Sequence, residues 1–196
     1  TFYMIVGMIR PDSGSISLDG EDIGRLPMYR RALKGISYLP QEASIFRRLT
    51  VRDNIRAVLE IKGCNDAEIS EKTGELLDEF NLRECADRLG HKLSGGERRR
   101  TEIARAVATG PTFILFDEPL AGIDPIAIIE LKKMFRYLKA KGLGILITDH
   151  NVRDTLSITD RAYIISNGSI LYEWIPEKLI ANPKVKEAYL GEEFKL

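Results

Sequence analysis

The stretch "LSGGERRRTEIARAV", residues 93–107, places two adjacent glycines at the start of a segment that is otherwise typical of a long, arginine-rich helix. Ser94 and Glu97 have the spacing of a capping box, in which each side chain accepts the backbone amide hydrogen of the other residue. This pattern does not explain Gly95 and Gly96, because a glycine inside a helix costs about 1 kcal/mol relative to alanine. Glycine does let a large anion approach the backbone, and a helix N-terminus offers unpaired amide hydrogens and the positive end of a dipole. We therefore expect Ser94, Gly95 and Gly96 to contact phosphate.

Composition excludes several classes of protein. With 196 residues, of which 44% are hydrophobic, the chain can bury the core of one domain, with or without a small lobe. Basic and acidic residues number 29 each, so no overall field favours nucleic acid, and we expect no nucleic-acid partner. Cys64 and Cys85 lack metal-ligand spacing, and we expect free thiols in a reducing cytoplasm. No apolar run approaches the ~18 residues of a membrane span, so we expect no direct membrane insertion.

The first half of the chain contains short elements followed by a charged helical stretch. We predict a helix in residues 1–9, a short strand with an Asp-Gly turn in 15–23, and a β-rich run in 35–42. From residue 50 to about 88 the apolar residues recur at helical spacing among many charges, which predicts a separate helical lobe.

The second half of the chain predicts a βαβ unit. "TFILFDEP" (112–119) and "LGILITDH" (143–150) are short apolar runs typical of strands buried on both faces, and "DPIAIIELKKMFRYLKAKG" (124–142) between them is helical. The two strands should therefore be parallel. Residues 162–174 predict a hairpin that turns at Asn167-Gly168, followed by a terminal helix in 176–191.

Polar side chains follow the predicted strands where those strands end. Asp117 and Glu118 follow the first strand, Asp149 and His150 follow the second, and Gln41 follows the 35–42 run. The carboxyl ends of parallel strands meet at the edge where open α/β sheets bind ligands, so we expect these side chains to share one rim.

Two adjacent acids suit phosphoryl transfer because one can hold Mg²⁺ and the next can orient or deprotonate the attacking water. We assign these roles to Asp117 and Glu118 respectively. For His150 we expect a γ-phosphate contact, and for Gln41 an amide oxygen near Mg²⁺. The simpler alternatives are solvated carboxylates, a surface histidine and an ordinary loop amide.

Arginines are concentrated in two stretches. Those at 98, 99, 100 and 105 could form an anion-binding face, but the default for such a run is a solvated helix whose arginines pair with acids, and we assign them no catalytic role. Those of "FRRLTVRDNIR" (46–56) could meet a partner or solvent, and the flanking apolar residues favour a docking groove.

Taken in order, these motifs resemble the ATP-binding-cassette (ABC) ATPases. "LPQE" (39–42) is similar to the Q-loop of that family, "LSGGE" (93–97) to its signature, "FILFDE" (113–118) to Walker B, "AGIDP" (121–125) to the D-loop and "TDH" (148–150) to the switch histidine. The signature usually reads LSGGQ, so Glu97 is a departure.

The resemblance implies an α/β fold of the P-loop NTPase type, with a mostly parallel sheet core and an inserted helical subdomain. It divides the chain into a partial RecA-like core (1–49), the helical subdomain (50–92), the rest of the RecA-like core (93–175), and a C-terminal helix and tail (176–196). No G-x-x-x-x-G-K-[ST] motif is present, and the family places that loop just before a helix matching the first residues here. We therefore expect the N-terminal strands and the P-loop to be absent from this chain, and these 196 residues alone to bind ATP weakly and hydrolyse little.

The resemblance also implies ligands and partners. Two subunits would sandwich two ATP molecules head to tail, with Ser94, Gly95, Gly96 and Glu97 of one subunit reaching the γ-phosphate held by the other. Asp124 would cross the same interface. ATP and Mg²⁺ are the expected cofactors; the other nucleotide-binding residues would be Gln41, Asp117 and His150, with Gln41 and Asp117 at the metal. Transmembrane permease subunits would dock on the helical subdomain, placing the protein on the cytoplasmic face of the inner membrane.

Four stretches are similar to the family's ATPases that power lipopolysaccharide extraction and export in Gram-negative bacteria, namely residues 38–51, 93–106, 147–153 and 189–196. The ATPases of branched-chain amino-acid importers are the nearest alternative. DNA-maintenance ATPases of the same family insert a long coiled coil, whereas the segment between Gln41 and Leu93 has no sustained heptads. A non-catalytic binding module is a further alternative, favoured only by the missing P-loop and opposed by the intact acids and histidine.

Overall fold

The computed structural model describes residues 1–176, 178 and 185. The chain divides into two compact units: unit 1 comprises Thr1–Asp117 and Lys139–Leu146, and unit 2 comprises Glu118–Leu138 and Ile147–Leu196. The predicted C-terminal helix and tail (176–196) lie outside the described residues, apart from Pro176, Lys178 and Val185. The predicted division of the chain into four parts stays a prediction.

A three-stranded sheet has the order β3 (Ile36–Leu39), β4 (Phe113–Asp117), β5 (Gly144–Thr148). β3 and β4 are parallel. The Gly144 amide donates to the Thr112 carbonyl at the start of β4 and β5, and the Glu118 amide donates to the Thr148 carbonyl at their ends. β4 and β5 therefore run in the same direction, as the βαβ pattern predicts.

The predicted burial of the strands is confirmed for β4 and wrong for β5. Ile114, Leu115 and Phe116 in β4 are buried, whereas Leu146 in β5 is 38% exposed and no residue of β5 is fully buried. β5 is the edge strand of the described sheet, so fewer neighbours cover its side chains than cover those of the central strand.

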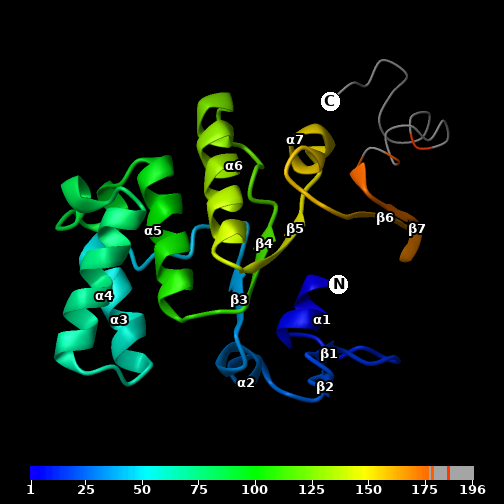
Figure 1. The fold of residues 1–196 in the computed structure, drawn as a ribbon, viewed down its shortest axis with the longest axis horizontal. Coiled ribbons are helices and arrows are strands. Elements are labelled where there is room, and N and C mark those ends of the chain that lie inside the picture. Colours follow the sequence, from blue (N-terminus) through cyan, green and yellow to red (C-terminus); the bar gives the residue numbers. More distant parts are fainter. Residues whose placement is uncertain (177, 179–184, 186–196) are drawn as a thin grey trace. The chain divides into compact units, whose positions relative to one another are not determined.

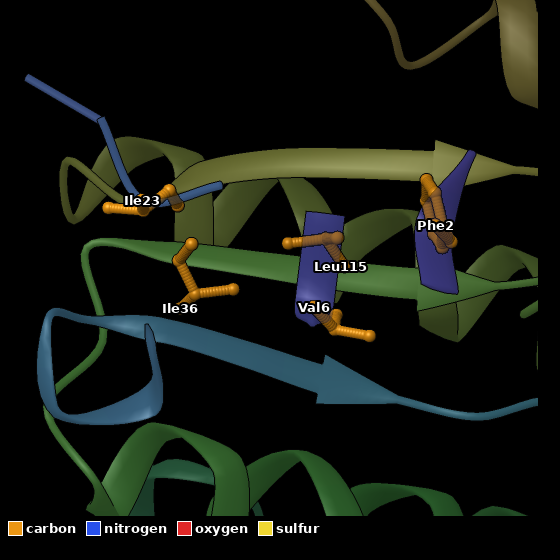
Figure 2. Packing of buried hydrophobic residues seen from close by; sticks show 5 residues of the cluster. All are labelled: Phe2, Val6, Ile23, Ile36 and Leu115. Carbon is orange, nitrogen blue, oxygen red and sulfur yellow. The ribbon is translucent and has the colours of Figure 1, made fainter. Parts of the chain in front are cut away.

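One face of β3 and β4 is covered by helix α1 (Phe2–Val6), as Figure 2 shows. Ile36 and Leu115 point to this face and pack with Phe2, Val6 and Ile23 in one buried cluster. Since side chains alternate along a strand, Tyr38 and Asp117 lie on the same face as Ile36 and Leu115.

Arg31, in helix α2 (Met28–Leu33), ties this corner of unit 1 together. Its buried guanidinium donates to four backbone carbonyls, those of Met4, Ile5, Gly24 and Leu26. Burial lowers the pKa of Arg31, against a smaller opposing effect of Asp22, and the four acceptors compensate for the lost hydration. The arginine thereby fixes α1 to the segment that follows the hairpin of β1 (Ser17–Leu18) and β2 (Glu21–Asp22).

The charged stretch after residue 50 is helical, as predicted. Helices α3 (Val51–Ile61) and α4 (Asp66–Glu79) lie beside α5 (Gly95–Ala108) (Figure 1). Two short 3-10 helices, Arg83–Cys85 and Gly90–Lys92, lie in the connection from α4 to α5. Val51, Ile55 and Leu59 recur four residues apart and are buried, which explains why this charged segment folds as an amphipathic helix.

Unit 2 contains helices α6 (Pro125–Ala140) and α7 (Val152–Leu156) and the hairpin of β6 (Ala162–Ser166) and β7 (Ser169–Trp174). Asn167 and Gly168 both have positive φ, 50° and 76°, as a two-residue hairpin turn requires, so the predicted turn is confirmed. Among the helices that the structure describes, none is both long and apolar enough to cross a membrane.

Candidate functional site

The glycine pair opens helix α5, as predicted. Ser94 is the N-cap, its hydroxyl accepts the Glu97 amide hydrogen at 3.3 Å, and its own amide donates to Glu97 Oε2 at 2.9 Å. The Ser94 hydroxyl also donates to the same carboxylate oxygen. The capping box is therefore complete.

The fold itself does not require either glycine of the pair. Neither Gly95 nor Gly96 has a positive φ. A Cβ at Gly95 would meet no heavy atom within 4 Å, and one at Gly96 would meet only ordinary van der Waals contact with Arg100. Glycines that ease no contact within the chain favour a requirement from outside it, such as a bound anion.

Glu97 brings a negative charge to this helix N-terminus. The hydrogen bond from the Ser94 amide lowers the pKa of Glu97, burial opposes the shift, and the Ser94 hydroxyl and Arg88 add to the lowering. Arg88 Nη1 lies 2.8 Å from Glu97 Oε1. The carboxylate is thus ionised at neutral pH. It lies at the helix N-terminus, where the helix dipole would also attract phosphate. Sequence reasoning missed Arg88, which lies outside the motif.

Asp117, the last residue of β4, is held by a tyrosine that sequence reasoning missed. Tyr38 in β3 donates its hydroxyl hydrogen to Asp117 Oδ2 at 2.9 Å. Burial raises the pKa of Tyr38 and the hydrogen bond to Asp117 raises it further, so the hydroxyl remains a donor at neutral pH. The ring of Tyr3 meets the Tyr38 ring edge-on, at a centroid distance of 6.4 Å, which limits how that ring can turn.

Gln41 lies in an exposed segment after β3, in the same unit as Asp117. Its predicted approach to a metal at Asp117 stays a prediction.

Glu118 and His150 meet in unit 2. His150 Nδ1 lies 3.3 Å from Glu118 Oε2, and the two side chains are 72% and 38% exposed, so solvent and ligands reach both. Glu118 has φ 43°, a left-handed conformation that costs a residue with a side chain about 1–2 kcal/mol. Such strain is concentrated at functional sites.

Asp124 has a structural role in the same unit. Its Oδ1 accepts the Ala127 amide hydrogen at 2.9 Å, and Pro125 takes the first helical position, so Asp124 caps helix α6. This capping accounts for the residue without a second subunit. The predicted role of Asp124 across a dimer interface stays a prediction.

The arginines of α5 pair as expected only in part. Arg99 forms an ion pair with Glu102, but Arg105 donates to the carbonyl and hydroxyl of Ser44 and stacks 4.6 Å from the Phe46 ring centroid. Arg105 therefore anchors the segment after β3 rather than facing solvent.

Asp117 supplies a carboxylate of the kind that holds a nucleotide-bound Mg²⁺. Among the described residues, no three or more His, Cys, Asp or Glu side chains form a group that could hold a metal. Magnesium is usually bound through one or two carboxylates, with phosphate oxygens and waters completing its shell. Asp117, with Gln41 as a possible second oxygen donor, fits this arrangement.

Comparison with known proteins gives consistent results. Residues 1–121 match the ABC transporter family. The whole chain aligns with 82% of the length of the lipopolysaccharide export system ATP-binding protein LptB of Haemophilus influenzae, at 57% identity. It aligns with the same share of LptB of Escherichia coli K12 at 52% identity. It is also 55% identical to 69% of a probable ABC transporter ATP-binding protein of Azorhizobium caulinodans.

Solved structures share the fold. An ATP-binding cassette of an ABC transporter, MJ1267, superposes with a TM-score of 0.85 at 28% identity, over 97% of this chain and 82% of that one. The cbiO1 protein of Clostridium perfringens, described as part of the ABC transporter complex cbiONQ, gives a TM-score of 0.84 at 23% identity, over 95% of this chain and 75% of that one. The predicted fold class is therefore confirmed.

Proposed function

Because this chain belongs to the ATP-binding subunits of ABC transporters, we propose that it is the ATP-hydrolysing subunit that powers lipopolysaccharide extraction and export from the inner membrane. The substrate is inferred from the relatives named for lipopolysaccharide export, since an ATPase subunit has no need to touch the transported molecule. The proposal places the protein at the cytoplasmic face of that membrane, held there by transmembrane subunits.

The glycine pair is the observation that carries the proposal. Neither Gly95 nor Gly96 is needed for the shape or packing of the chain, yet both stand at an exposed helix N-terminus that can bind an anion. A second copy, arranged head to tail, would present the γ-phosphate of its ATP to Ser94, Gly95 and Gly96. This arrangement explains why Ser94 and Gly95 are exposed and Gly96 is only half-buried in a single chain.

The acids and the histidine supply the chemistry. Glu118 would orient or deprotonate the attacking water, and His150, whose Nδ1 lies 3.3 Å from that carboxylate, would contact the γ-phosphate. Asp117 and Gln41 would hold Mg²⁺, which, when bound with ATP, offsets the charge that develops on the phosphate oxygens. Tyr38 keeps the Asp117 carboxylate in one orientation.

The experiment that tests the substrate assignment is purification of the full-length gene product with its native membrane partners, followed by their identification. Membrane subunits that move lipopolysaccharide, with ATP turnover that depends on that lipid in reconstituted vesicles, would support the proposal. Recovery of an amino-acid permease would contradict it and favour a branched-chain amino-acid importer.

A further inference from the structure

We propose that Asp149 is a positioning residue that holds Glu118 and His150 at their working separation. The inference rests on the proposed ATP hydrolysis and adds a residue to its machinery. Asp149 precedes His150 directly, and its side chain is 0% exposed. A carboxylate removed from water in this way has to be compensated by hydrogen bonds, and its partners show what it does.

Both oxygens of Asp149 bind backbone amides. Oδ2 accepts from the Leu120 amide at 2.8 Å, and Oδ1 accepts from the Asn151 amide at 2.8 Å. Leu120 follows Glu118 by two residues, and Asn151 follows His150 directly. One side chain therefore joins the segment that carries the acid to the segment that carries the histidine.

The bond to Leu120 also bears on the strained backbone of Glu118. A left-handed residue persists only where its surroundings fix it. The Glu118 amide donates to the Thr148 carbonyl at 2.8 Å, and the Leu120 amide donates to Asp149. Residues 118 and 120 are thus both tied to residues 148–149. Without the second bond, the backbone that carries the Glu118 carboxylate would lose one of its constraints.

The chemistry of the site requires a carboxylate rather than any polar side chain. Two amide donors approach two different oxygens, and an ionised carboxylate accepts at both. An asparagine has one acceptor oxygen, so its NH₂ group would face one of the two N–H groups. The Asp149→Asn variant therefore loses one bond while keeping nearly the same size.

A local turn role is the competing explanation. The bond to Asn151 spans two residues and could merely shape the loop before α7. The bond to Leu120 spans 29 positions, which a loop-shaping role does not need. If Asp149 has the positioning role, its loss misplaces the Glu118 carboxylate. If it has only the local turn role, its loss leaves Glu118 in place.

The test compares Asp149→Asn with a matched control, Asp154→Asn, in the full-length protein assembled with its membrane partners. Asp154 lies in the same unit and pairs with Lys132. It also accepts from the Asn151 side chain, but not from the Leu120 and Asn151 backbone amides that bind Asp149, so its loss affects stability and leaves both bonds of Asp149 in place. We expect Asp149→Asn to lower kcat by about tenfold to a hundredfold with the KM for ATP nearly unchanged, because small misplacements of a reacting group have effects of this size. The control should keep its kcat.

A second variant removes only the long-range bond. Replacing the Leu120 amide by an ester deletes the N–H and keeps the side chain, so this variant remains informative if Asp149→Asn fails to fold. It should lower kcat in the same way, and amide exchange at Asn151 should stay slow. If both changes lower the melting temperature but leave kcat as high as in Asp154→Asn, the positioning role is wrong.

Failure of the proposed function gives a different result. If Glu118→Gln keeps full turnover, then ATP hydrolysis does not use this acid, whatever Asp149 does. If Glu118→Gln is inactive and Asp149→Asn fully active, only the inference about Asp149 is overturned.

Discussion

His150 Nδ1 lies 3.3 Å from Glu118 Oε2, although the two residues belong to loops 32 positions apart in the sequence. Both lie in unit 2 and both are reached by solvent. The proposed roles of Glu118 toward the attacking water and of His150 toward the γ-phosphate require the two side chains to be this close.

Replacing the acid should stop hydrolysis and leave nucleotide binding intact. Glu118→Gln keeps the shape but removes the negative charge and the basicity, and general-base catalysis typically contributes about 10²–10⁴-fold in rate. In the full-length subunit we expect kcat to fall within that range and the ATP-bound dimer to accumulate. Turnover assays with size-exclusion chromatography measure both effects. Unchanged turnover would remove Glu118 from its catalytic role.

Tyr38, which donates to Asp117, should affect the response to Mg²⁺. Tyr38→Phe removes the hydroxyl that donates to Asp117 and leaves the ring contact with Tyr3. Loss of such a partner commonly weakens metal binding by about 10–100-fold, so the half-saturating Mg²⁺ concentration for ATP binding should rise by at least about tenfold. Tyr29→Phe, which removes an exposed tyrosine hydroxyl in α2, is the matched control and should not change it. Equal Mg²⁺ requirements in the wild type and Tyr38→Phe would show that the hydrogen bond is irrelevant to the metal.

Although the family resemblance groups Glu97 with the nucleotide-binding residues, its charge should weaken the proposed contact of the glycine pair with phosphate. Glu97→Gln preserves the capping box, since glutamine also serves at this position, and removes a charge that repels phosphate. At about 0.3–1 kcal/mol for each of the two helix ends that face ATP in the dimer, the dissociation constant of the ATP-bound dimer should fall by roughly three- to thirtyfold. Glu68→Gln, in the equivalent capping box of α4, is the control and should have no effect. A weaker dimer in Glu97→Gln would contradict this account of the carboxylate.

The pair formed by Lys132 and Asp154 predicts a pH dependence of stability. The hydrogen bond from Lys132 lowers the pKa of Asp154, against a smaller opposing effect of burial, and Asn151 adds to the lowering. A group with a depressed folded pKa stabilises the fold above its unfolded pKa, near 3.9 for aspartate, and this stabilisation is lost as pH falls through the folded value. Asp154→Asn should therefore lower the free energy of unfolding by about 1 kcal/mol at pH 7 and by much less near pH 2. Urea denaturation at the two pH values measures this; an equal loss at both would rule out the charge as its cause.

The local features of this chain could be predicted from the sequence. The capping box at Ser94 and Glu97 spans three positions, and the hairpin turn at Asn167-Gly168 depends on two residues that tolerate positive φ. The burial of β5 was mispredicted because an apolar run indicates what could be buried and not whether neighbours cover it.

The partners of the site residues could not be predicted in the same way. The hydrogen bond from Tyr38 to Asp117 spans 79 positions, and that from Leu120 to Asp149 spans 29. The register of β3 against β4 brings Tyr38 to Asp117. The pairing of β5 beside β4 brings Asp149 to Leu120. The sequence alone does not indicate which group a tyrosine within a strand, or a buried acid beside a histidine, will bind, because the partner depends on the tertiary fold.

The central claim is that the glycine pair serves a nucleotide held by another subunit, and Gly95→Ala tests it most directly. A Cβ at this position meets nothing in the chain and alanine favours helix, so the variant should be as stable as the wild type or more stable by up to about 1 kcal/mol. Gly74→Ala, inside α4, is the matched control, where a Cβ also meets no close contact. Measured by size-exclusion chromatography with light scattering on full-length protein that carries Glu118→Gln, the ATP-dependent dimer should be lost in Gly95→Ala and kept in Gly74→Ala. A dimer that forms equally well in both variants would contradict the account.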